Sequence, residues 1–212
     1  MLCSAYWIKD TEQSECTKLE HFFASIDILL VMRIDIIGPS GSGKSTMAAR
    51  LAKGLNMPHI QIDKFWFEAG GKQGSHDTKN IDEVRAHIRK SLSNALGPES
   101  WVSDGTYIRE QDGIAPLADV IIFLDIPLHV RLWNHTRRIF FESRCHQHLS
   151  IWDEVKFYKE IVKRTYTTRP KIISFIRDYK DKTITLRSYR DIDLYVSQLL
   201  DSNDSARLQK KQ

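Results

Sequence analysis

Residues 32–55 read MRIDIIGPSGSGKSTMAARLAKGL, and this stretch decides the fold that the rest of the chain must accommodate. Its centre, from Gly38 to Ser45, matches the phosphate-loop pattern G-x-x-x-x-G-K-[ST] without a mismatch. Isoleucines before the pattern form a short β-branched run, which is typical of a buried parallel strand. Apolar residues after it repeat at helical spacing, at Met47, Leu51 and Leu55. The sequence therefore predicts a strand, a glycine-rich loop and a helix, in that order.

This order of elements is suited to holding a polyphosphate. Glycines let successive backbone N–H groups curve around an anion, and the helix N-terminus adds partial positive charge. Lys44 can reach the β- and γ-phosphates of a nucleotide, and the Ser45 hydroxyl can hold Mg²⁺. An ordinary Gly/Ser turn is disfavoured because the spacing and both flanks agree with the motif. We expect ATP and Mg²⁺ as ligands, with nucleotide contacts from Gly38, Pro39, Ser40, Gly41, Ser42, Gly43, Lys44, Ser45 and Thr46.

Length and composition indicate one globular domain. The chain has 212 residues, of which 42% are hydrophobic and 27% charged, as in an ordinary soluble protein. The net charge of +4 is uneven, because residues 127–190 carry 15 Lys and Arg against 6 Asp and Glu. This basic part suits a polyanionic small ligand, or it is a solvated helical surface. No recognised nucleic-acid module is present, although a nucleic-acid partner stays open.

The chain ends and the cysteines bear on organisation and location. We expect a core domain over 32–200, a loosely attached extension over 1–31 and a frayed polar tail over 201–212. The alternative for 1–31 is an added helix packed on the domain. Its apolar run is too short to cross a bilayer, so no membrane association is expected. Three cysteines without a C-x-x-C pair favour a reducing, cytoplasmic location. The sequence leaves a monomer and a homodimer open.

Strand and helix patterns alternate along the core domain. Strands are predicted at 58–63, 101–105, within 118–127 and at 183–186, in addition to the strand before the loop. Helices are predicted near 81–96, 128–141, 155–165, from Pro170 onward, and at 192–200, with a short lid near 142–153. The sequence thus predicts an α/β fold, a doubly wound, mostly parallel five-stranded sheet with helices on both faces and a short helical lid.

Three predicted strands end in a carboxylate. Carboxyl ends of strands in an open α/β sheet face the ligand crevice, which makes Asp63, Asp104 and Asp125 candidate site residues. We expect Asp104 to hold Mg²⁺ through water and Asp63 to orient an acceptor, with a movable flap following at 64–80. Turn capping is the alternative for Asp63, and a structural role is the alternative for Asp125.

The chain from Met32 to about Leu199 resembles the adenylate-kinase-like P-loop kinases, and among them the bacterial DNA topology modulation group. The P-loop alone is typical of many NTPases, whereas the third- and fourth-strand motifs are more particular to nucleotide-kinase-like folds. The matching pieces are the loop at 38–46, Ile62-Asp63 with Trp66, Trp101-Val102, Asp104-Gly105-x-Tyr107, Leu124-Asp125-x-Pro127, Trp133, Arg137-Arg138, Arg169-Pro170 and Leu186-Arg187-Ser188.

The resemblance implies a kinase that transfers a phosphoryl group from ATP·Mg to a small-molecule acceptor, such as a nucleotide or nucleoside. It implies a Mg²⁺ role for Asp104, and nucleotide or phosphate contacts for Arg131, Arg137, Arg138 and Arg169. Asn134 stands where such proteins often carry an arginine, so the resemblance supports ATP binding well and AMP as the acceptor poorly. The alternative is an ATP-binding regulatory or nucleic-acid-associated protein that hydrolyses ATP slowly.

Overall fold

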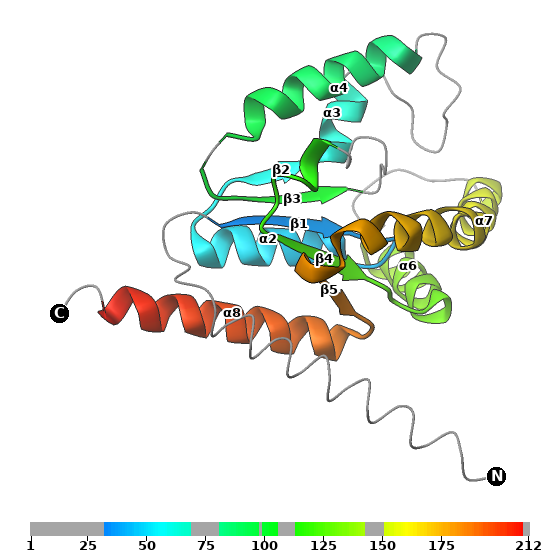
Figure 1. Cartoon of the computed structure of the whole chain (residues 1–212). Coiled ribbons are helices and arrows are strands. Elements are labelled where there is room, and N and C mark those ends of the chain that lie inside the picture. Colours follow the sequence, from blue (N-terminus) through cyan, green and yellow to red (C-terminus); the bar gives the residue numbers. More distant parts are fainter. Residues whose placement is uncertain (1–31, 69–80, 98, 106–112, 143–150, 210–212) are drawn as a thin grey trace.

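A computed structural model describes residues 32–68, 81–97, 99–105, 113–142 and 151–209. Its centre is a sheet of five parallel strands in the order β2-β3-β1-β4-β5 (Figure 1). The strands are β1 (Arg33–Ile37), β2 (His59–Gln61), β3 (Trp101–Gly105), β4 (Val120–Leu124) and β5 (Thr183–Leu186). The predicted α/β class, the number of strands and their parallel pairing are confirmed.

Strand β1 lies in the middle of the sheet and is completely paired. It pairs with β3 on one side and with β4 on the other, so that Ile36 lies opposite both Asp104 and Ile122. Strands buried on both faces need apolar side chains in both directions. Strand β4 supplies them throughout, and β1 supplies isoleucines together with the buried Asp35, which accepts a hydrogen bond from Ser103. The loop after β1 therefore starts at the centre of the carboxyl edge of the sheet.

Helices cover both faces of the sheet (Figure 1). On one face, α2 (Lys44–Leu55) and α8 (Tyr189–Gln209) pack against the even-numbered residues of β1 and β4. On the other, α4 (Ile81–Ala95), the turn near Ile114 and the end of α7 (Ile151–Ile176) cover the alternate residues. The remaining described elements are α3 (Ile62–Glu68), α6 (Leu128–Glu142) and the 3-10 helix η1 (Arg177–Lys182). Two apolar layers thus hold the strands in register.

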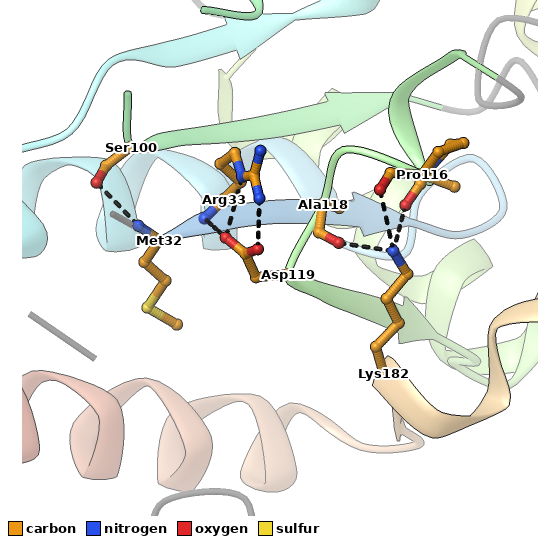
Figure 2. A network of polar contacts seen from close by, with 8 residues as sticks. Met32, Arg33, Ser100, Pro116, Ala118, Asp119 and Lys182 are labelled. Atoms are coloured by element: carbon orange, nitrogen blue, oxygen red, sulfur yellow. Dashed lines mark hydrogen bonds and ion pairs between the residues drawn. The ribbon is translucent and has the colours of Figure 1, made fainter. Parts of the chain in front are cut away.

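Polar contacts tie together the amino-terminal edge of the sheet, away from the loop (Figure 2). Arg33 donates to Asp119 through its backbone N–H at 2.8 Å and its guanidinium at 2.7 Å, which joins the start of β1 to the segment before β4. The Lys182 ammonium donates to the carbonyls of Ala115 and Ala118, both at 2.7 Å. Burial lowers the pKa of Lys182. The hydrogen bonds of the Lys182 ammonium thus go to backbone carbonyls of the protein itself.

Three sequence expectations about element bounds are wrong. The second strand ends at Gln61, and Asp63 lies in the first turn of α3, so part of the expected flap is helix. Residues expected to form two helices belong to the single helix α7, with Pro170 inside it. The last helix continues to Gln209 instead of ending at Leu200.

Other expectations lie outside the described residues. These are the state of the extension at 1–31, the flap residues 69–80 and the lid residues 143–150. In the part of the chain that the structure describes, no helix has the length and apolar character needed to span a bilayer.

The Lys182 contacts generate a prediction about stability. Lys182→Met should lower the free energy of unfolding by about 1–3 kcal/mol, because a charged donor to two close backbone carbonyls is removed. Urea unfolding measures the loss. Lys180→Met is the matched control, since Lys180 is exposed in the same 3-10 helix. Equal losses in the two variants would contradict the structural role of Lys182.

Candidate phosphate-binding and metal-binding site

The loop after β1 has the backbone conformation of an anion-binding site. Gly41 and Gly43 have φ values of 79° and 93°, a region that L side chains rarely adopt. Such turns aim successive N–H groups at one point. Helix α2 then begins at Lys44 with no side-chain cap and no acidic residue in its first turn. The helix N-terminus is therefore left to attract an anion.

The first turn of α2 carries the predicted lysine and serine. The Lys44 ammonium donates to the carbonyl of Pro39 at 3.2 Å, so the side chain folds over the loop. The Ser45 hydroxyl donates to Oδ2 of Asp104 on β3 at 2.5 Å. Asp104 is only 3% exposed. The structure thus brings together the two residues predicted to serve Mg²⁺, from positions 59 residues apart.

The donor set at this contact fits Mg²⁺. A hydroxyl and a carboxylate are hard oxygen ligands, and Mg²⁺ in nucleotide sites usually takes one or two protein ligands plus phosphates and waters. Across residues 32–68, 81–97, 99–105, 113–142 and 151–209, no group of three or more His, Cys, Asp or Glu side chains could hold a metal by itself. Ser45 and Asp104 therefore suit a metal that arrives with a phosphate ligand.

A histidine that sequence reasoning did not single out completes this contact. The Nε2 atom of His59, the first residue of β2, lies 2.6 Å from Oδ1 of Asp104. Both carboxylate oxygens are thus engaged by side chains from different elements. No local sequence signal identifies His59, because its partner becomes visible only once β2 is known to pair with β3.

Arg131 lies beneath the loop and is buried, with 1% of its surface exposed. Its guanidinium donates to the carbonyls of Ile126 and Ser40, both at 3.0 Å, and to the hydroxyl of Thr165 at 2.8 Å. Burial lowers the pKa of Arg131, although nearby Asp125 acts against this effect. Arg131 thus connects α6 with the phosphate loop and with α7. Its predicted contact with a nucleotide stays a prediction.

Arg169 forms a bidentate ion pair with Asp125. Its Nε and one terminal nitrogen donate to the two carboxylate oxygens at 2.7 and 2.8 Å. This pairing raises the pKa of the Arg169 guanidinium. Arg169 lies one helical turn after Thr165, so α7 is attached to the loop region at two consecutive turns. Asp125 thus has a defined structural partner, and the predicted role of Arg169 in transfer is untested by this contact.

Tyr189, at the start of α8, closes the other side of the loop. Its hydroxyl accepts a hydrogen bond from Asn134 at 2.6 Å and donates to the carbonyl of Gly41 at 3.4 Å. Burial raises the pKa of Tyr189. A Cβ atom at Gly43 would lie 3.2 Å from the tyrosine ring. Asn134, which stands where the resembling kinases often carry an arginine, therefore links α6 to Tyr189 of α8 and, through the tyrosine hydroxyl, to the loop.

The other predicted residues lie on α3 and α6. Asp63 is exposed in the first turn of α3, directly after β2. Arg137 is exposed on α6, and Arg138 belongs to the same helix with its side chain outside the described atoms. Their roles toward nucleotide or acceptor stay predictions.

Comparison with known proteins places this site in a family. Residues 34–125 match the AAA domain family AAA_33. The chain is 32% identical over 108 residues to the protein YqaC of Bacillus subtilis, covering 50% of this chain and 56% of YqaC. It is 31% identical over 88 residues to an adenylate kinase sequence of Streptomyces scabiei, covering 42% of this chain and 100% of that sequence. A shikimate kinase structure from Bacteroides thetaiotaomicron superimposes with a TM-score of 0.55 at 19% identity, covering 80% of this chain and 97% of that one.

The chain belongs to the adenylate-kinase-like P-loop kinases. It spans 56% of the length of YqaC and 42% of the length of the adenylate kinase of Streptomyces lividans. The shikimate kinase superposition supports the fold alone. The closer resemblance to the DNA topology modulation group stays a prediction.

The burial of Arg131 gives a second prediction. Arg131→Met should lower the free energy of unfolding by about 2–4 kcal/mol, because three hydrogen-bond acceptors lose a charged donor. Thermal and urea unfolding measure the loss. Arg137→Met on the same helix should change stability by less than about 0.5 kcal/mol, since Arg137 is exposed. A stability of Arg131→Met equal to that of Arg137→Met would contradict this assignment.

Proposed function

We propose that the protein is a kinase that transfers the γ-phosphoryl group of ATP·Mg to a small-molecule acceptor. The observation that carries the proposal is the 2.5 Å contact between Ser45, at the N-terminus of α2, and the buried carboxylate of Asp104. This contact lies at the carboxyl edge of the sheet, where the phosphate loop, α2 and β3 meet. Its chemistry suits a metal-bound polyphosphate.

Each residue of this cluster has a distinct proposed task. Backbone N–H groups of residues 38–46 bind the phosphate oxygens, and Lys44 leaves the Pro39 carbonyl to contact the β- and γ-phosphates. The Ser45 hydroxyl would hold Mg²⁺ directly, and Asp104 would hold it through water. When bound, Mg²⁺ neutralises phosphate charge and orients the transferred group.

Positive side chains from α6 and α7 complete the proposed site. Phosphoryl transfer depends mainly on positioning and charge stabilisation. Arg169 is fixed at the end of β4 by Asp125, and we propose that its guanidinium covers charge on the transferred group. We propose Arg137 and Arg138, both on α6, as further contacts to the nucleotide or its phosphates, and Arg131 as a support of the phosphate loop.

The acceptor is proposed to bind beside α3. Asp63 follows β2, so it lies at the same edge of the sheet as Asp104. A carboxylate there can accept a proton from an attacking hydroxyl. One similar protein is named adenylate kinase, which supports a nucleotide as the acceptor class. A nucleoside or a small hydroxylated metabolite is the other acceptor class to be tested.

An ADP-formation screen tests the proposal directly. The full chain is incubated with ATP and Mg²⁺ and with nucleosides, nucleoside monophosphates or small hydroxylated metabolites. Acceptor-dependent ADP formation with a phosphorylated product supports the kinase. ATP binding with only slow, acceptor-independent hydrolysis that responds to a macromolecular partner would favour a regulatory protein.

Substitution of the loop lysine tests the phosphate site. Lys44→Ala should weaken ATP binding and lower turnover by about 10²–10³-fold, because a preorganised positive charge on the phosphates is removed. The fold should persist, as judged by circular dichroism on the same sample. Lys53→Ala, at the exposed end of the same helix, should behave as the unaltered protein. Unchanged ATP affinity and turnover in Lys44→Ala would refute the phosphate role.

Substitution of Asp63 separates acceptor binding from ATP binding. Asp63→Ala should keep ATP affinity within about twofold and lower acceptor-dependent transfer by at least about 100-fold, since a held and deprotonated nucleophile is lost. Asp178→Ala, which removes an exposed carboxylate from the first turn of η1, controls for helix-end effects. If Asp63→Ala lowers stability and leaves the transfer kinetics intact, Asp63 only stabilises the end of α3, and the acceptor role is refuted.

A further inference from the structure

We infer that His59 is a positioning residue that holds the Asp104 carboxylate in the orientation needed to serve the nucleotide-bound metal. The inference rests on the proposed function, because it concerns the same metal site. The observation behind it is the 2.6 Å contact between Nε2 of His59 and Oδ1 of Asp104. Nothing in the phosphate-loop motif requires this histidine.

Strand register explains how His59 reaches the carboxylate. His59 lies opposite Val102, two residues before Asp104, in the parallel pairing of β2 with β3. Residues two apart on a strand point to the same face. His59 therefore reaches diagonally along β3 from the neighbouring strand, and its side chain is only 17% exposed. The strand backbones thus fix the approach of the imidazole.

The two oxygens of Asp104 have different partners. Oδ2 accepts the hydrogen bond from Ser45, and Oδ1 faces His59. Because an ionised carboxylate only accepts hydrogen bonds, Nε2 of His59 is assigned as the donor. Hydrogen bonds to both oxygens restrain the rotation of a carboxylate about its Cβ–Cγ bond. His59 thereby keeps Oδ2 directed at the hydroxyl that is proposed to hold Mg²⁺.

This geometry predicts an effect on metal binding rather than on phosphate binding. Asp104 is buried, so water cannot readily replace the imidazole at Oδ1. Loss of an outer partner of a metal-serving group commonly lowers metal affinity by about 10–100-fold. The loop N–H groups and Lys44 do not depend on His59. ATP affinity measured without metal should therefore be retained.

The test compares His59→Leu, which lacks a donor, with His59→Gln, whose amide nitrogen can occupy the place of Nε2. Mn²⁺ binding to the full chain in the presence of ATP is followed by electron paramagnetic resonance. The Mg²⁺ concentration for half-maximal ADP formation is measured in parallel. His87→Leu, an exposed histidine of α4, is the matched control.

We expect His59→Leu to weaken Mn²⁺ binding at least about tenfold, with metal-free ATP affinity within about twofold. His59→Gln should restore Mn²⁺ binding to within about threefold of the unaltered protein, and His87→Leu should match that protein. Unchanged Mn²⁺ binding in a folded His59→Leu overturns the inference. Equal weakening in the Leu and Gln variants overturns it as well, because the retained donor would then be irrelevant.

Two further variants separate this inference from the proposed function. If Asp104→Asn weakens Mn²⁺ binding and His59→Leu does not, only the positioning role fails. If neither Asp104→Asn nor Lys44→Ala affects binding of Mn²⁺ and ATP, the proposed function fails, and the inference with it. Should His59→Leu not fold, His59→Asn replaces it, because its shorter amide cannot reach Oδ1. Equal metal binding in His59→Asn and His59→Gln would then overturn the inference.

Discussion

The parallel pairing of β1 with β3 is the constraint on which the candidate site depends. Parallel neighbours end at the same edge of a sheet, and the register places Ile36 opposite Asp104. The phosphate loop begins two residues later, so the first turn of α2 returns above the end of β3 and Ser45 meets the carboxylate. A slip of one residue would turn Asp104 to the opposite face of the sheet. The apolar layers on both faces prevent that slip. The packing of the core therefore also fixes the geometry of the site.

Charge in the basic part of the chain is used in at least three physically different ways. Lys182 donates hydrogen bonds to backbone carbonyls at the amino-terminal edge of the sheet. Arg131 is buried under the phosphate loop, where it donates to protein oxygens. Arg169 is partly exposed and paired with Asp125. The family resemblance predicted ligand contacts for both Arg131 and Arg169. A count of charges cannot distinguish these uses, because each depends on which oxygens the folded chain places within reach.

The wrong element bounds have physical causes as well. Ile62 is fully buried against Gly105, so the chain turns into α3 immediately after β2 and carries Asp63 into a helix. Pro170 removes one N–H donor, and the carbonyl that this donor would have served belongs to Tyr166, a residue that is 73% exposed. Polar residues after Leu200 remain helical, where Ser202 and Ser205 donate to carbonyls four residues earlier. The polar residues after Leu200 thus mark the solvent-facing end of α8 and not the point where the helix stops.

The sequence by itself determined the α/β class, the parallel five-stranded sheet, the phosphate loop and the carboxylate at the end of β3. These follow from local patterns: β-branched runs, helical spacing and glycines at fixed offsets. Only the tertiary structure decided that Asp104 lies between Ser45 and His59, that Arg131 is buried, and that Asn134 pairs with Tyr189. Such contacts join residues that are 34 to 91 positions apart in the sequence. Their existence depends on strand order and register, which local sequence patterns do not encode.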